Sequence, residues 1–210
     1  MSGSQSPRQP AVSQMRLFIA LPLPGPTRAA LGKIMDDLQP TSNAVRWVKP
    51  ENTHLTLRFL GDTNPSLLPA LIHLINRAAK QQAALELKLD QLGAFPGFRK
   101  ARVYWISTTD STATEHLADL ATQIGQGVRE LGFQAEQKRF KPHLTLGRVK
   151  QPDNLAGLAQ AMRAYRLPPL VVPLTRIALI HSTLTPRGAN YQTLHESSLV
   201  GGQQSKEPRQ

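Results

Sequence analysis

The sequence contains no cysteine among its 210 residues. A disulfide framework, a thiol nucleophile and a cysteine metal site are therefore excluded, and the absence fits a reducing compartment. No apolar run reaches the roughly 18 residues that a transmembrane helix needs, so we expect no membrane partner. The opening segment, MSGSQSPRQPAVSQ, lacks the apolar centre of a signal peptide. We therefore expect a cytoplasmic protein, with a short transit peptide as the alternative.

Acidic residues are scarce relative to basic ones. The chain has 14 Asp and Glu against 25 Lys and Arg, a formal net charge of +11 and a pI near 10.6. Such a balance favours a polyanionic partner such as RNA or DNA. General surface basicity would explain the same balance without nucleic acid, so charge alone leaves both interpretations open.

Composition divides the chain into a folded centre and two polar ends. We expect residues 1–14 and 200–210 to be disordered tails, because their composition offers little apolar surface to bury. The whole chain is 40% hydrophobic, which suffices for a core. Its length suits one domain or two small lobes, and we place one bilobal domain at residues 15–199.

Hydrophobic patterns predict an α+β fold. Four helices are expected where apolar residues recur at helical spacing, beginning near Thr27, at Pro65, at Thr112 with Glu115 in capping-box spacing, and at Asp153 or Asn154. Short apolar or alternating runs predict strands at residues 15–21, 45–48, 54–61, 85–92, 102–107, 143–149, 170–180 and 191–199. The order is β-α-β-β-α-β-β-α-β-α-β-β.

The tetrapeptide His-Leu-Thr-Leu occurs twice, at residues 54–57 and 143–146. Each copy lies in an expected strand with a helix before it and another after it. The two matched surroundings indicate an internal duplication, with too few copies for a solenoid. We therefore expect two pseudo-symmetric lobes, each with a mainly antiparallel sheet and flanking helices, and a cleft between them.

The side chains of each motif divide between the two faces of its strand. His54 and Thr56 share one face, as do His143 and Thr145, while the leucines face the core. Positions two apart on a strand are separated by about 6.6 Å, so both polar side chains can reach one phosphate-sized group. Packing at a strand surface would explain one such histidine, but two copies in matched contexts favour a shared site.

Two imidazoles and two hydroxyls suit phosphodiester chemistry without a metal. A protonated histidine can give a proton to the departing oxygen while a neutral one takes a proton from the attacking group. A histidine pKa near 6.5 allows both states near neutrality, and each acid or base contributes typically ~10² to 10⁴ in rate. No carboxylate cluster has the spacing of metal ligands, so we expect neither metal nor cofactor.

The paired motifs resemble the double His-x-Thr-x signature of the 2H phosphoesterases. Their surroundings, RLFIALPLP, VRWVKPENTHLTLRFLG, LGAFP, ARVYW and RFKPHLTLGRV, resemble the RNA 2′,3′-cyclic phosphodiesterase branch, historically called 2′-5′ RNA ligase, from about residue 15 to 199. The resemblance implies a bilobal α+β fold with a central cleft. It implies metal-independent opening of a 2′,3′-cyclic phosphate to a 2′-phosphate, with reversible 2′-5′ ligation in some members.

The resemblance also assigns roles and partners. It implies that His54 donates the proton and His143 accepts one. The threonine hydroxyls of Thr56 and Thr145, with nearby arginines, would hold the phosphoryl oxygens. The expected partners are RNA ends that carry a cyclic phosphate, or small nucleotides, and we expect the chain to act as a monomer.

Four further residues are expected to bind substrate. Arg58 has the strand parity of the first motif's histidine, and Arg139 lies just before the second motif. Strict alternation places Arg148 on the leucine face, but Gly147 before it could permit a bulge that turns the arginine toward the cleft. Phe18 could stack a base, with core packing as the alternative.

A third His-x-Thr-x match, HSTL, spans residues 181–184. Serine replaces the anchoring leucine, and a Thr-Pro-Arg-Gly turn follows directly. We therefore expect His181 to be poorly fixed near a strand end and to contribute little, although it could still border the cleft. His73, His116 and His195 are expected to be surface residues.

Two other functions fit the same residues. A non-catalytic nucleotide or RNA binder could use this scaffold, although intact histidines and threonines in both motifs argue against it. A related phosphodiesterase could act on a different cyclic nucleotide, because loops such as 93–101 and 185–190 would set the choice of substrate. Turnover of a nucleoside 2′,3′-cyclic phosphate separates binding from catalysis.

Overall fold

The computed structural model describes residues 13–151, 155–186 and 188–201. In chain order the regular elements are β1 (Met15–Pro22), α1 (Gly25–Leu38), β2 (Val45–Trp47), β3 (His54–Thr63), α2 (Leu68–Gln81), β4 (Leu85–Lys88), β5 (Gln91–Phe95), β6 (Val103–Ser107), α3 (Ser111–Glu130), β7 (Leu144–Val149), α4 (Ala156–Ala164), β8 (Val171–Leu174), β9 (Arg176–Thr185) and β10 (Gly188–Ser198). Short 3₁₀ turns occur at residues 39–41, 50–52, 65–67 and 98–100. The α+β class predicted from the sequence is confirmed.

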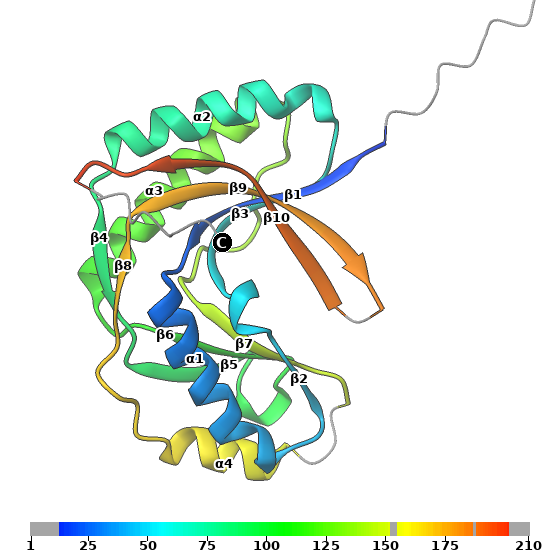
Figure 1. Ribbon diagram of the computed structural model, residues 1–210, viewed down its shortest axis with the longest axis vertical. Coiled ribbons are helices and arrows are strands. Elements are labelled where there is room, and N and C mark those ends of the chain that lie inside the picture. Colours follow the sequence, from blue (N-terminus) through cyan, green and yellow to red (C-terminus); the bar gives the residue numbers. More distant parts are fainter. Residues whose placement is uncertain (1–12, 152–154, 187, 202–210) are drawn as a thin grey trace, which may run out of the picture.

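An eight-stranded sheet forms the centre of the fold (Figure 1). Its strand order is β10-β9-β1-β3-β7-β6-β5, and β2 also pairs with β7. The strands that carry the two motifs, β3 and β7, meet through the antiparallel pair Leu55 and Leu144. The sheet therefore divides there into two halves, each of which contains one motif. β4 and β8 pair separately in a two-stranded sheet.

Each half of the sheet is covered by one helix from the N-terminal part of the chain and one from the C-terminal part. Helices α2 and α3 pack together against the half that contains β3 and β9, whereas α1 and α4 lie beside the half that contains β5 (Figure 1). Helix α3 follows β6 in the chain but packs on β3. Each half thus includes helices from both parts of the sequence, and the two expected lobes share one sheet.

The four motif leucines are anchored in one hydrophobic core. Leu55, Leu144 and Leu146 are 0% exposed and Leu57 is 6% exposed, all within the same buried cluster. The alternation predicted from the sequence is therefore confirmed for these leucines. Because the leucines hold both strands in place, the opposite faces are left for the polar side chains.

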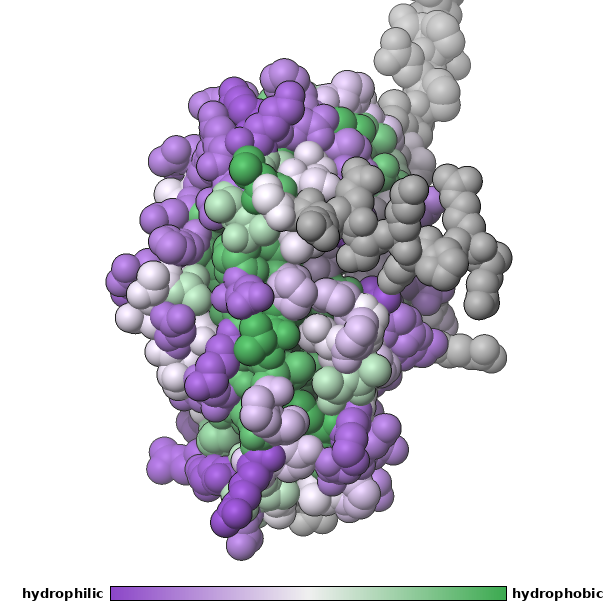
Figure 2. All heavy atoms as spheres, turned by 60° about the vertical axis from the view of Figure 1, so that its left-hand side comes forward, coloured by the Kyte–Doolittle hydropathy of each residue, from purple (hydrophilic) through white to green (hydrophobic). Residues whose placement is uncertain are grey.

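Apolar side chains also reach the surface beside the two-stranded sheet. Figure 2 shows them as a band between hydrophilic upper and lower ends, on the side of the molecule that carries β4 and β8. Val171, at the start of β8, is 53% exposed.

Two expected strands are each divided in the structure. The segment 85–92 changes partner between consecutive residues, since the Leu89 amide donates to Leu170 and the Asp90 amide donates to Ser107. β4 therefore belongs to the two-stranded sheet and β5 to the main sheet. Segment 170–180 makes the same crossing between β8 and β9. The alternation of apolar and polar residues in 85–92 continues across the change of sheet. The sequence pattern therefore does not show where one strand ends and the next begins.

The cap of α3 differs from the predicted capping box. Asp110 is the N-cap, and its carboxylate accepts hydrogen bonds from the amides of Thr112 at 2.9 Å and Ala113 at 3.2 Å. Thr112 therefore lies inside the first turn, because an upstream aspartate already occupies the capping position. The predicted caps of the last helix, residues 153 and 154, lie outside the described residues, and that helix begins at Ala156.

Candidate active site

The first motif lines the face of β3 that lies opposite the leucines. His54 pairs with Pro22 and Thr56 with Ala20 on the neighbouring strand β1. The His54 ring is 4.7 Å from the ring of Phe18 and 5.2 Å from that of Tyr191, measured between centroids. Aromatic rings from β1 and β10 thus hold the imidazole from two sides.

The second motif has the same arrangement, with His143 directly before β7 and Thr145 within it. The ring of His143 meets that of Phe95 edge-on at 5.0 Å, and Thr145 lies opposite Trp105 on β6. Nδ1 of His143 is 2.7 Å from the carbonyl oxygen of Lys141. Because a carbonyl only accepts hydrogen bonds, Nδ1 carries the proton and Nε2 is left as an acceptor.

The backbone support of the two histidines follows the same pattern. His54 bonds to the backbone of Asn52 and His143 to that of Lys141, in each case two residues earlier in the chain. Such a bond fixes the ring orientation and the tautomer. The duplication seen in the sequence therefore extends to the groups that orient each imidazole.

Each motif strand contains a bulge at the fourth residue of its motif. On β3 the pairing with β1 passes from Thr56 to Arg58 and omits Leu57. On β7 the pairing with β6 passes from Thr145 to Gly147 and omits Leu146. An inserted residue reverses the alternation of the side chains that follow it.

The bulges decide which side chains share the face of the histidines. After the bulge on β7, Arg148 pairs with Val103 and lies on the face of Thr145. The bulge suggested at Gly147 lies one residue earlier, at Leu146, and it brings Arg148 to the face that was expected. At the equivalent position on β3 stands Phe59, which pairs with Phe18 and is 58% exposed. One half thus contributes a cation and the other an aromatic ring.

Arg58 does not follow the parity that its sequence position suggests. It pairs with Ile19, on the core face of β1, and is only 8% exposed. One guanidinium nitrogen, Nη1, lies 3.1 Å from Glu136, and the other, Nη2, donates to the carbonyl of Gln134. The bulge at Leu57 thus reverses the strand parity expected for Arg58, but Arg58 still lines a pocket that Thr56 and His143 also border, so its role in substrate binding stays a prediction.

Burial and a nearby cation lower the pKa of both histidines. Burial lowers the pKa of His54 from 6.5 to about 4; its hydrogen bond to Asn52 opposes the change, and the charges of Arg148 and His143 add to it. Burial also lowers the pKa of His143, with the bond to Lys141 opposing and Arg148 adding. Both imidazoles are therefore mostly neutral at pH 7 in the empty site, and Arg148 acts on both.

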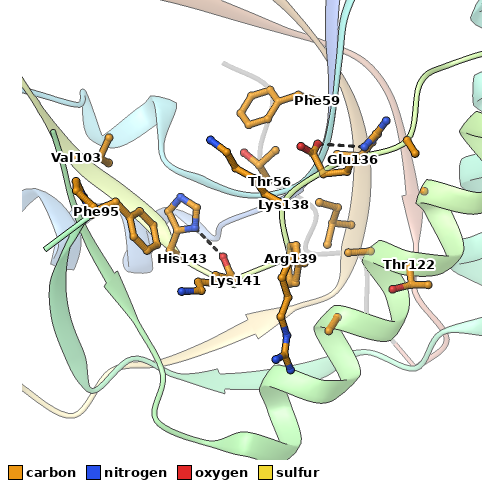
Figure 3. A pocket seen from close by; sticks show the side chains of 18 of the residues that line it. Thr56, Phe59, Phe95, Val103, Thr122, Glu136, Lys138, Arg139, Lys141 and His143 are labelled. Atoms are coloured by element: carbon orange, nitrogen blue, oxygen red, sulfur yellow. Dashed lines mark hydrogen bonds and ion pairs between the residues drawn. The ribbon is translucent and has the colours of Figure 1, made fainter.

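A pocket of 1290 Å³ opens beside the two motifs. Thr56 and His143 border it, and Figure 3 shows them near Phe59 and Phe95. Arg139 also lines this pocket, on the segment that leads into the second motif. One imidazole, that of His143, therefore lines this cavity together with the hydroxyl of Thr56 and several cations, a donor set suited to a phosphate group. His54, Thr145 and Arg148 are not among the lining residues of the pocket.

The family follows from comparison with known proteins. A family model described as the 2′-5′ RNA ligase superfamily matches residues 25–185. The chain belongs to this superfamily.

Relatives and solved structures of the superfamily cover most of the chain. An RNA 2′,3′-cyclic phosphodiesterase from Thermus thermophilus is 35% identical, covering 89% of this chain and 91% of the relative. One from Thermotoga maritima is 30% identical, covering 90% and 97%. The crystal structure of E. coli LigT complexed with 3′-AMP superimposes with a TM-score of 0.70 and 26% identity, covering 89% of this chain and 98% of that one.

Two residues of the site had no signal in the sequence. Tyr191 reaches His54 from β10, and burial raises the pKa of its hydroxyl, which is therefore protonated. Phe59 reaches the same face only because of the bulge. By contrast Phe18, expected as a base-stacking residue, is 2% exposed and packs beneath His54 and Tyr191. Its role in the structure is to support the rings around it.

The third motif copy faces away from the site. His181 pairs with Leu17, a core residue, whereas Ile180 pairs with Phe18 on the face of His54. His181 also lies within β9 and is paired on its other side with Gln192. The expected loose strand end is therefore wrong, because β9 continues to Thr185. His181 differs from His54 and His143 because its side chain lies on the opposite face of the sheet.

Neither a metal-ligand cluster nor a membrane helix is found in the part of the chain that the structure describes. No group of three or more His, Asp or Glu side chains there could hold a metal ion. None of the described helices is both long enough and apolar enough to cross a membrane.

Proposed function

We propose that the protein is a metal-independent RNA 2′,3′-cyclic phosphodiesterase that opens the cyclic phosphate to a 2′-phosphate. The observation that carries the proposal is the pair of histidines on one face of two adjoining strands, with Arg148 acting on both. The curated relatives from Thermus and Thermotoga bear the same activity in their names.

The reaction requires one proton to be removed and one to be supplied. Nε2 of His143 takes a proton from water as the water oxygen bonds to phosphorus. His54, protonated, gives its proton to the 3′-oxygen as the bond between phosphorus and that oxygen breaks. The phosphate stays on the 2′-oxygen. General acid–base catalysis of this kind contributes typically ~10² to 10⁴ for each group.

The remaining groups stabilise the charge that develops on the phosphoryl oxygens. Thr56 and Thr145 lie two residues after their histidines on the same faces, so their hydroxyls can donate to the non-bridging oxygens. Arg148 supplies positive charge on the same side. These fixed donors lower the barrier most where they are already oriented before reaction.

Substrate binding itself favours protonation of the proton donor. In the empty site the pKa of His54 is about 4, in part because Arg148 disfavours the imidazolium. A bound phosphate anion offsets the charge of Arg148 and attracts a proton. We infer that His54 takes up its proton together with the substrate.

The same site supports 2′-5′ ligation. If the 5′-hydroxyl of a second RNA replaces water, His143 removes the hydroxyl proton and His54 again protonates the departing 3′-oxygen. The product is a 2′-5′ phosphodiester, and the reverse reaction uses the same groups with their roles exchanged. Because one chain supplies both histidines, we infer that a monomer suffices. RNA as the substrate fits the cytoplasm as the place of action.

A short RNA that ends in a 2′,3′-cyclic phosphate tests the proposal. The expected product carries a 2′-phosphate, identified by chromatography against 2′- and 3′-phosphate standards, with turnover unchanged after exhaustive EDTA treatment. Loss of activity on chelation, with recovery on adding Zn²⁺ or Mn²⁺, would contradict the metal-free mechanism. Binding without turnover would favour the non-catalytic alternative, and turnover of another cyclic nucleotide alone would favour the related phosphodiesterase.

A further inference from the structure

The pocket beside the motifs extends far beyond the reacting groups. From Thr56 and His143 it continues to helix α3, whose residues Ala118, Ala121, Thr122 and Gly125 line its far side. These four lie on one face of the helix, and their small side chains leave the space open. A cyclic phosphate held by Thr56 and His143 would fill only that end, so most of the 1290 Å³ would remain for another part of the substrate.

Cations from three separate elements surround this extension. Lys100 and Arg102 come from the turn between β5 and β6, and Arg129 comes from the end of α3. The segment between α3 and β7 contributes Lys138, Arg139 and Lys141, and Figure 3 shows their side chains around the opening.

Among the residues that the structure describes, no carboxylate lies within ion-pair distance of these six cations. Glu136 is the carboxylate that lines the pocket, and it is held by the buried Arg58 at 3.1 Å. Unpaired cations converging on a cavity raise the local concentration of an anionic ligand.

We propose that this extension binds the backbone phosphates of the RNA strand that leads to the cyclic end. The proposal rests on the proposed function and specifies its substrate class: the end of a polynucleotide is preferred over a nucleoside cyclic phosphate. A strand of successive phosphates matches cations placed on several elements better than one isolated phosphate does. The exposed ring of Phe59, which also lines the pocket, offers a surface for one base.

The proposal is tested by replacing single cations of the pocket with glutamine and by making the same replacement at a cation outside the pocket as a control. Arg102→Gln and Arg129→Gln remove one cation each from the pocket, whereas Arg77→Gln removes an exposed cation from α2 that does not line it. Each variant is assayed with cytidine 2′,3′-cyclic phosphate and with a hexanucleotide that ends in the same group. The ratio of kcat/KM for the hexanucleotide to that for the mononucleotide should fall at least fivefold in each pocket variant. It should stay within twofold of wild type in Arg77→Gln.

A binding measurement keeps this test separate from the proposed reaction. Fluorescence anisotropy with a labelled hexanucleotide that ends in a 3′-phosphate requires no turnover. The pocket variants should bind at least fivefold more weakly, with a smaller salt dependence of Kd than wild type or Arg77→Gln. Equal weakening in all three variants, or none in the pocket variants, overturns the strand-binding proposal. Absence of turnover in wild type, with these binding differences intact, would instead overturn the proposed hydrolysis alone.

Discussion

Leu57 and Leu146 occupy equivalent bulges in the two halves of the sheet. Each is the fourth residue of its motif, and each is omitted from the pairing with the adjacent strand. The side chain two positions later then returns to the face of the histidine, which places Phe59 in one half and Arg148 in the other. A symmetric backbone thus presents an asymmetric pair of side chains, so that Arg148 can meet a phosphate while the ring of Phe59 offers a surface for a base.

Gly147→Ala should damage both the fold and the site. A Cβ at this position would lie 2.5 Å from Cγ1 of Val45 on β2, so the Val45 side chain or one of the two strands must move. We expect a loss of about 1 to 3 kcal/mol in the free energy of unfolding, the usual cost of overpacking. Because Arg148 is the next residue, we also expect kcat/KM to fall by about tenfold, equivalent to ~1.4 kcal/mol. Urea denaturation and steady-state assays measure the two effects.

Gly157→Ala is the matched control for this substitution. A Cβ there would meet only the carbonyl oxygen of Thr41, at the ordinary contact distance of 3.5 Å, and the residue lies in α4. Alanine in a helix is favoured over glycine by up to about 1 kcal/mol, so the control should be neutral or stabilising. Equal effects of the two substitutions would show that the contact with Val45 does not constrain β7.

The pH dependence of catalysis should reflect the lowered histidine pKa values. The reactive state of the free protein has one histidine protonated and the other neutral, and it is most populated between their two pKa values. Because the pKa of His54 is lowered to about 4 and that of His143 is also lowered from 6.5, we expect kcat/KM to be maximal below pH 6.5. A pH–rate profile with cytidine 2′,3′-cyclic phosphate measures this, and a maximum above pH 8 would contradict it.

Arg148→Met should move the same profile toward higher pH. The guanidinium disfavours both imidazolium ions, so its removal raises the pKa of His54 and of His143. NMR titration of the imidazole resonances of the free protein should show both increases directly. kcat/KM should fall at every pH, since the phosphate also loses a positive charge. Arg77→Met, which removes an exposed cation on α2, serves as the control and should leave the profile in place.

The sequence predicted the parts of the site that depend on local alternation. The buried faces of Leu55, Leu57, Leu144 and Leu146, and the possible bulge near Gly147, could be inferred because strand periodicity acts over a few residues. The direction of Arg58 could not, since its partner strand decides where the bulge lies.

Long-range pairing explains the other differences. The change of sheet between Leu89 and Asp90 depends on Leu170 and Ser107, which are distant in the sequence. Tyr191 reaches His54 only because β9 and β10 extend the half of the sheet that contains β1. No sequence motif marks Tyr191, and its place in the site follows only from its contact with His54 in the folded protein.

Glu136→Gln should loosen the segment that leads into the second motif. Glu136, itself 54% exposed, compensates the guanidinium of Arg58, which is only 8% exposed, so removal of the carboxylate charge leaves a buried cation with only a neutral partner. We expect a loss of about 1 to 3 kcal/mol in the free energy of unfolding, between the values for exposed and fully buried pairs. Because this segment carries Lys138 and Arg139, KM for an oligonucleotide should also rise.

Glu196→Gln provides the comparison for the ion pair. Glu196 lies 2.9 Å from Arg176, but the two side chains are 32% and 34% exposed, so water compensates for the lost charge. We expect a change below about 1 kcal/mol by urea denaturation. If both substitutions destabilise the protein equally, the burial of Arg58 does not determine the strength of its pair.

Alanine substitutions of three histidines test the choice of catalytic pair. His54→Ala and His143→Ala should each lower kcat for the cyclic phosphate by ~10² or more, because each removes a proton-transfer group. The double variant should lose much less than the product of the two effects, since the groups act as a unit. His181→Ala should change kcat less than tenfold. Its motif also has a threonine two residues after the histidine, but the side chain of His181 lies on the face of Leu17 and cannot reach the substrate beside Thr56. A loss at His181 as large as at the other two, with near-UV circular dichroism unchanged, would show that the face of the sheet does not determine the catalytic histidines.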